Sequence, residues 1–114
     1  MADNERAKKD WVDKSMAKWA TMQRTIEQGR LEKNPLVEDW MKESVQLFEA
    51  MLVPYDHAAN GKNAIQPMNG EERLNFVKAK LRSPQAYQQL QALFMEAAKK
   101  AASLHARNIK SESF

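Results

Sequence analysis

The stretch YQQLQALFMEAAKKAASL, residues 87–104, carries the most specific pattern in the chain. Its apolar residues recur at spacings of three, four, three, four and three, and they are Tyr87, Leu90, Phe94, Ala97, Ala101 and Leu104. This is the periodicity of an α-helix that buries one narrow seam. The alanines remove side-chain bulk, so another helix can approach closely. The stretch therefore predicts a long helix packed against a second helix, which comes either from the same chain or from another copy.

Helix start and stop signals divide the rest of the chain into three further helices. The first is expected from Asp3 or Asn4 to Gln28, with Gly29 as its stop. The second is expected from Asn34 and Pro35 to about Val53, because Asn can cap a helix and Pro suits its first position. The other two are expected over 70–81, started by a capping box of Asn69 and Glu72, and over 84–108, started by Ser83 and Pro84.

The composition supports an all-α fold. Only three of the 114 residues are glycine and four are proline, 43% are hydrophobic, and the apolar residues are spaced regularly. A chain of this length suits one domain. We therefore predict one helical domain over residues 1–114, a four-helix bundle of three long helices and one short one, either monomeric or dimeric. Residues 1–9 and 109–114 contain little apolar surface and are expected to fray.

The segment 54–70 is the one long irregular stretch. It contains two prolines and two Asn-Gly pairs, which oppose a continuous helix. Connections of this length are usually either functional or mobile, but this one could also simply span the bundle, anchored by Tyr55, Ile65 and Met68.

The same segment holds the nearest approach to a catalytic group, the adjacent pair Asp56 and His57 with Tyr55 and Lys62 close by. It offers no serine or threonine nucleophile, and the other histidine, His105, lies far along the chain. Two histidines without any cysteine also provide no metal-ligand motif. We predict no enzymatic activity, no catalytic residue, no metal, no cofactor and no small-molecule substrate.

Charge is distributed unevenly along the chain, although the net charge is only +3. Residues 36–57 hold five acidic side chains and one lysine, whereas residues 77–110 hold seven basic side chains and one glutamate. One part of the chain can therefore attract the other, within a molecule or between two.

Nucleic-acid binding is the main alternative function. The segments 71–81 and 84–94, joined at Arg82 and Ser83, have the outline of a helix-turn-helix, and the glutamines at 85, 88, 89 and 91 could read bases. The second helix is, however, too long for a usual recognition helix.

Binding to a membrane or another hydrophobic surface is a weaker alternative. Trp11 and Trp19 lie on one stripe among lysines, but Asp10 and Asp13 interrupt the basic face, and tryptophan on such a stripe usually belongs to a core. The absence of cysteine fits a reducing compartment, and we expect the cytoplasm.

The sequence thus favours a helical interaction module, a small regulator, adaptor or accessory subunit that binds a protein partner or itself. We expect the contact surface to comprise the seam, the basic face of the last helix and the segment after the second helix. Its candidate residues are Tyr87, Leu90, Phe94, Ala97, Ala101, Leu104, Lys99, Lys100, Arg107, Tyr55, His57 and Lys62.

Overall fold

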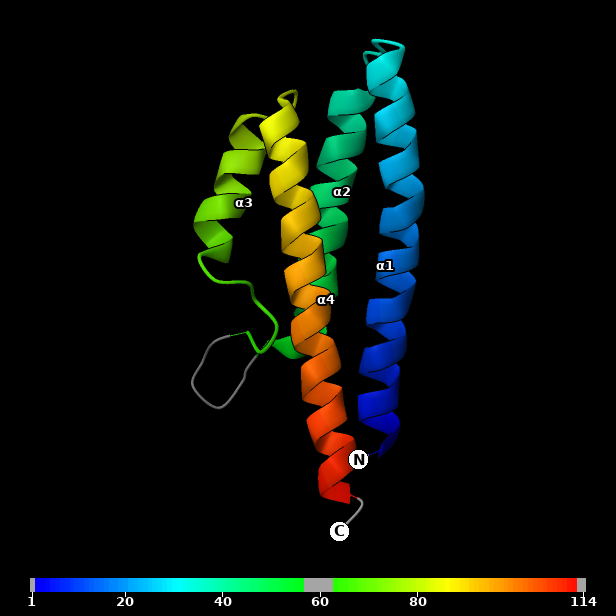
Figure 1. Cartoon of the computed structure of the whole chain (residues 1–114), viewed down its shortest axis with the longest axis vertical. Coiled ribbons are helices and arrows are strands. Elements are labelled where there is room, and N and C mark those ends of the chain that lie inside the picture. Colours follow the sequence, from blue (N-terminus) through cyan, green and yellow to red (C-terminus); the bar gives the residue numbers. More distant parts are fainter. Residues whose placement is uncertain (1, 57–62, 113–114) are drawn as a thin grey trace.

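The computed structural model describes residues 2–56 and 63–112, with side chains described for residues 5–56 and 63–107. These residues form an all-α, four-helix bundle (Figure 1). The elements are α1 (Ala2–Leu31), α2 (Val37–Leu52), the short 3-10 helix η1 (Val53–Tyr55), α3 (Gly70–Ala79) and α4 (Pro84–Glu112). No strand occurs in the part of the chain that the structure describes.

The two long helices, α1 and α4, run antiparallel along the whole molecule, so that both termini lie at the same end (Figure 1). The shorter α2 and α3 accompany them over only one half of their length. Helix α1 packs against α2 and α4, and α3 packs mainly against α4. The molecule is accordingly elongated, with extents of 54 × 25 × 16 Å.

Three aromatic side chains join the long helices and α2 at the centre of the core. The rings of Trp19 and Phe94 are stacked, with their centroids 4.4 Å apart. Phe48 contacts Phe94 edge-on, with the centroids 5.2 Å apart. All three are fully or almost fully buried. Such aromatic pairs stabilise a fold by about 0.5–1.5 kcal/mol beyond the apolar area that they bury. The face of α1 that carries Trp19 and the seam of α4 that carries Phe94 therefore pack against each other.

The turn between α1 and α2 differs from the prediction. Gly29 does not stop the first helix, which continues to Leu31; it is buried, and a Cβ at this position would lie 2.6 Å from Cζ3 of Trp40. The left-handed residue is instead Lys33, with φ of 55°. The Asn34 side chain accepts a hydrogen bond from the Leu36 amide, so Asn34 caps the turn, and α2 begins only at Val37.

The start of α3 also corrects the sequence reading. Asn69 has φ of 54°, and its side chain makes no capping hydrogen bond, so the predicted capping box with Glu72 is wrong. The helix begins at Gly70 as expected but ends at Ala79, two residues early. The prediction for Ser83 is confirmed, because its hydroxyl accepts a hydrogen bond from the Ala86 amide at 3.0 Å.

The helices at the two ends of the chain are longer than the sequence predicted. Helix α1 already begins at Ala2, and α4 continues to Glu112, beyond the expected end at Asn108. The two helices lie side by side in this half of the molecule (Figure 1), and Glu5 contacts His105 there. Each helix thus packs against the other at these ends. Such tertiary contacts stabilise a helix beyond what its helix propensity alone predicts.

Candidate interaction surfaces

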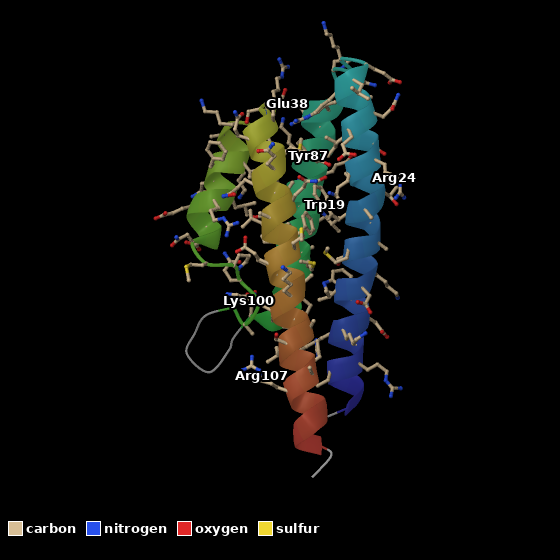
Figure 2. The ribbon with its side chains drawn as sticks, viewed as in Figure 1. Trp19, Arg24, Glu38, Tyr87, Lys100 and Arg107 are labelled. Atoms are coloured by element: carbon tan, nitrogen blue, oxygen red, sulfur yellow. The ribbon has the colours of Figure 1, made fainter. Side chains whose placement is uncertain are left out.

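The predicted α4 seam is filled by the chain's own helices. Five of its six residues are buried, and Leu104 is partly buried against the same core. Trp19 of α1 contacts both Tyr87 and Phe94, and Figure 2 shows Trp19 and Tyr87 in the space between the two helices. The prediction that these residues meet a partner therefore needs correction: a partner could reach the seam only if the bundle opened. The residues concerned are Tyr87, Leu90, Phe94, Ala97, Ala101 and Leu104.

Tyr55 also lies inside the molecule instead of on a contact surface. Only 2% of its surface is exposed, and its hydroxyl lies 2.7 Å from Nε2 of His105. On the other side of the imidazole, Nδ1 lies 3.1 Å from a carboxylate oxygen of Glu5. Because a carboxylate can only accept, Nδ1 carries a proton, and in the neutral ring Nε2 accepts from the Tyr55 hydroxyl. Burial, together with the negative charges of Glu5 and Asp13, raises the pKa of Tyr55 to about 12.

The alignment of Glu5, His105 and Tyr55 has the order of a carboxylate, an imidazole and a hydroxyl, which is also the order of a catalytic triad. Tyr55 and His105 are almost completely inaccessible to solvent, so a substrate would not reach the hydroxyl. The arrangement instead joins η1, α4 and α1 through buried hydrogen bonds. His57 and Lys62, which the sequence placed beside Tyr55, lie outside the described residues.

The described basic residues of α4 do not all lie on the same side of the helix. Lys100 and Arg107 are exposed and extend from the same side of the helix (Figure 2), whereas Lys99 is turned away by about 100°. The Lys100 ammonium donates a hydrogen bond to the Gln66 carbonyl at 2.8 Å. Its charge is therefore directed toward the segment before α3.

The charge asymmetry of the sequence is partly satisfied within the molecule. Arg82 pairs with Glu38 at 2.9 Å and Lys78 pairs with Glu49 at 3.2 Å, so that the acidic α2 attracts α3 and the turn after it. Arg73 and Glu96 form a bidentate ion pair between α3 and α4. This pair holds the pKa of Glu96 below its usual range, mainly through the hydrogen bonds from Arg73. Two of the seven basic side chains of residues 77–110, Lys78 and Arg82, are thus paired with carboxylates.

The predicted helix-turn-helix has a different geometry. Helices α3 and α4 lie alongside each other as a helical hairpin (Figure 1), whereas the two helices of a helix-turn-helix cross at a steep angle. Gln85 and Gln88 are exposed, but Gln89 and Gln91 are partly buried. Only part of the glutamine set is thus accessible to a ligand.

A large open depression lies between the end of α2 with η1 and the start of α3, and we call it the α2–α3 groove. It has a volume of about 1010 Å³. Two apolar side chains that line it are strongly exposed, Val53 at 61% and Met68 at 76%. Met68 is therefore not the buried anchor that the sequence suggested, whereas Ile65 is fully buried. The charged residues of the groove are Glu49, Asp56, Glu71, Glu72 and Lys100.

Sequence reasoning missed this groove because its walls come from separate segments. The available signal was the sequence from Pro67 to Glu72, in which Met68 precedes two adjacent acids. That signal was interpreted only as a helix start. A second, smaller depression of about 480 Å³ lies between α1 and α2, where Met22, Trp40 and Leu47 are flanked by Lys18 and Glu43.

Other classes of site find no support among the described residues. No group of three or more histidine, aspartate or glutamate side chains in 2–56 and 63–112 is placed to hold a metal ion. None of the helices in this part of the chain is long and apolar enough to cross a membrane. Trp19 lies in the core, and Trp11 is 37% exposed with its indole N–H donating to the Ala50 carbonyl.

The described residues thus define a small all-α bundle with a closed core and an open groove lined by acidic side chains. The family model described as YpoC-like protein matches residues 9–109, and the chain belongs to this family. The match spans all four helices of the bundle. No curated protein and no solved structure matches the chain.

Proposed function

We propose that the chain is a non-enzymatic helical interaction module, and that it holds a protein partner in the α2–α3 groove. The observation that carries this proposal is the exposure of Val53 and Met68 in an open groove that is also lined by charged side chains. Isolated exposed apolar residues are common, but apolar residues that share one depression can be covered together by the apolar core of a protein interface. The partner therefore binds beside the closed core instead of on the α4 seam.

The proposal that the chain is not an enzyme rests on whether a substrate can reach its candidate catalytic side chains. The carboxylate, imidazole and hydroxyl of Glu5, His105 and Tyr55 are aligned, but the hydroxyl is buried. Among the described residues that line the α2–α3 groove, in turn, none is a histidine. These residues therefore place no general base in the pKa range of histidine in the groove. The absence of cysteine fits a reducing compartment, and we place the module in the cytoplasm.

The pairing of bases favours a protein over a nucleic acid as the partner. Arg73, Lys78 and Arg82 each contact a carboxylate. A phosphate backbone would have to compete with these intramolecular partners, and the acids of the groove would repel it.

Site-specific photo-cross-linking in the cell of origin tests the proposal. A photoreactive phenylalanine analogue replaces Met68 in the groove, and a matched control replaces Ala17, which is exposed on α1. We expect a discrete protein adduct at position 68 and none at position 17. Adducts of equal strength at both positions, or no protein adduct at position 68, would overturn the proposal.

A further inference from the structure

The α2–α3 groove is acidic in a chain that is basic overall. The described residues that line it carry four carboxylates, from Glu49, Asp56, Glu71 and Glu72, and one ammonium, from Lys100, whereas the whole chain has a net charge of +3. Negative charge and strongly exposed apolar side chains therefore occur together in this groove.

These carboxylates differ in how far the molecule itself neutralises them. Glu49 is paired with Lys78, and Asp56 accepts a hydrogen bond from the Asn63 side-chain amide at 2.7 Å. Glu71 and Glu72 are both exposed in the first turn of α3, and no cation of the described residues lies within ion-pair distance of them. They lie at the positive end of the α3 dipole, where negative charge is favoured. They are consequently available to a cation from outside.

The apolar part of the groove adds a second requirement. Val53 comes from η1 and Met68 from the segment before α3, so apolar surface is offered by two different elements. Methionine adapts to differently shaped partners because it is unbranched and has three rotatable bonds. An ion or a small polar solute would leave this surface in water. The occupant must therefore present both positive charge and apolar surface.

We infer that the groove binds a cationic amphipathic segment of a partner protein. Its lysine or arginine side chains pair with Glu71 and Glu72, and its apolar side chains cover Val53 and Met68. This inference rests on the proposed function and adds the chemistry of the partner to it. A helix with basic residues on one face and leucines on the other meets the requirement, and such helices dock in grooves of other proteins.

Binding of synthetic peptides to the full chain tests the inference. The first probe is an amphipathic peptide of leucine and lysine, and the matched probe has glutamate at every lysine position. Amide chemical shifts of the isotope-labelled chain report where each peptide binds. We expect the lysine peptide to shift the amides of Val53, Met68 and the first turn of α3, with salt weakening its affinity, and the glutamate peptide to leave them unchanged.

Variants of the chain measure how much the charges of Glu71 and Glu72 contribute to binding of the lysine peptide. The double variant Glu71→Gln and Glu72→Gln removes two negative charges from the groove. The control variant Asp10→Asn and Glu32→Gln removes two exposed acids of α1 and the turn after it. We expect the groove variant to bind the lysine peptide about tenfold more weakly, which is the upper range for two exposed ion pairs, and the control to bind it as the unmodified chain does. Met68→Ser should also weaken binding.

Four outcomes would overturn the inference: equal affinity for both peptides, equal affinity of both double variants, groove shifts produced by duplex DNA, or groove shifts produced by raising the concentration of the chain alone. The last would identify a second copy as the occupant. A discrete protein adduct at position 68 without binding of the lysine peptide would leave the proposed function standing and refute only this inference. Loss of the adduct would refute both.

Discussion

The Tyr55 hydroxyl lies 2.7 Å from Nε2 of His105 in the interior of the molecule, although fifty residues separate the two along the chain. Their rings also meet edge-on, with centroids 5.9 Å apart. His105 in turn contacts Glu5 near the start of α1. The three side chains thus hold η1 against the two long helices in the half of the bundle that α2 and α3 do not cover.

Replacing Tyr55 by phenylalanine should destabilise the fold by about 1–2 kcal/mol, because it leaves the buried Nε2 of His105 without a donor. Chemical unfolding monitored by circular dichroism measures this change. In a His105→Leu background the same substitution should cost less, since no acceptor is then left unpaired. If the two substitutions change the free energy of unfolding additively, Tyr55 and His105 are not coupled by the hydrogen bond.

Alkaline pH should unfold the protein as its tyrosines are forced to ionise. The chain has only two tyrosines, and burial raises the pKa of each, Tyr55 and Tyr87, to about 12 from an ordinary value of 10.0. The unfolded chain therefore loses these protons at lower pH, so that stability falls between about pH 10 and pH 12, by on the order of 2 kcal/mol for each tyrosine.

The near-ultraviolet absorbance of ionised tyrosine, recorded together with the circular dichroism of the helices, checks this expectation. Phenolate should appear only above pH 11 or together with loss of helix, whereas the urea-unfolded chain should titrate near its ordinary pKa. Titration of either tyrosine near pH 10 in the folded protein would contradict the buried positions.

Gly29→Ala should lower the stability of the protein even though alanine is the better helix former. The added Cβ would lie 2.6 Å from Trp40 Cζ3 and 2.9 Å from Val37 Cγ2. Overpacking costs about 1–3 kcal/mol, and the gain in helix propensity is about 1 kcal/mol, so we expect a net loss of about 1 kcal/mol. Thermal unfolding measures it. The double variant with Trp40→Leu serves as control, because removing the indole should restore room for the methyl group.

Glu96→Gln should make the protein less sensitive to acid. Arg73 holds the pKa of Glu96 below its usual range, so the ion pair stabilises the folded state above that range and its contribution is lost as the pH falls through the lowered pKa. Since the Glu96 side chain is 40% exposed, we expect the ion pair to contribute less than about 1 kcal/mol to the free energy of unfolding at neutral pH. Urea unfolding at pH 7 and pH 3 should show a smaller difference for the variant than for the unmodified chain.

The filled α4 seam predicts a monomer of 13.1 kDa in solution, which sedimentation equilibrium measures directly. Phe94→Ala should then cost about 3–5 kcal/mol, because it opens a cavity between Trp19 and Phe48. This cost should be independent of protein concentration. A midpoint of unfolding that rises with concentration would show instead that two chains share the core.

The helix of residues 87–104 and the cap at Ser83 were predictable because both depend on neighbours within one or two turns. The apolar spacing and the Ser-Pro pair carry that information locally. Gly29 and Asn69 were misjudged for the opposite reason. Gly29 resembles a helix stop until Trp40 is placed against it, and Asn69 resembles a cap until its backbone is seen to be left-handed.

The candidate site was less predictable than the fold. The sequence indicated that the seam needs a helical partner, but the identity of that partner depends on how Trp19 and Phe48 fill space. Likewise, nothing near Tyr55 in the sequence indicates His105. The α2–α3 groove exists only because η1 and the first turn of α3 are brought together.

The sequence by itself therefore determined the number and order of the four α-helices, since helix periodicity, caps and breakers act through short-range backbone geometry. Only the tertiary structure decided which apolar faces are buried, which charges are paired within the molecule, and which remain for a partner. Those choices depend on contacts between residues that are tens of positions apart, where packing and desolvation act on the whole bundle at once.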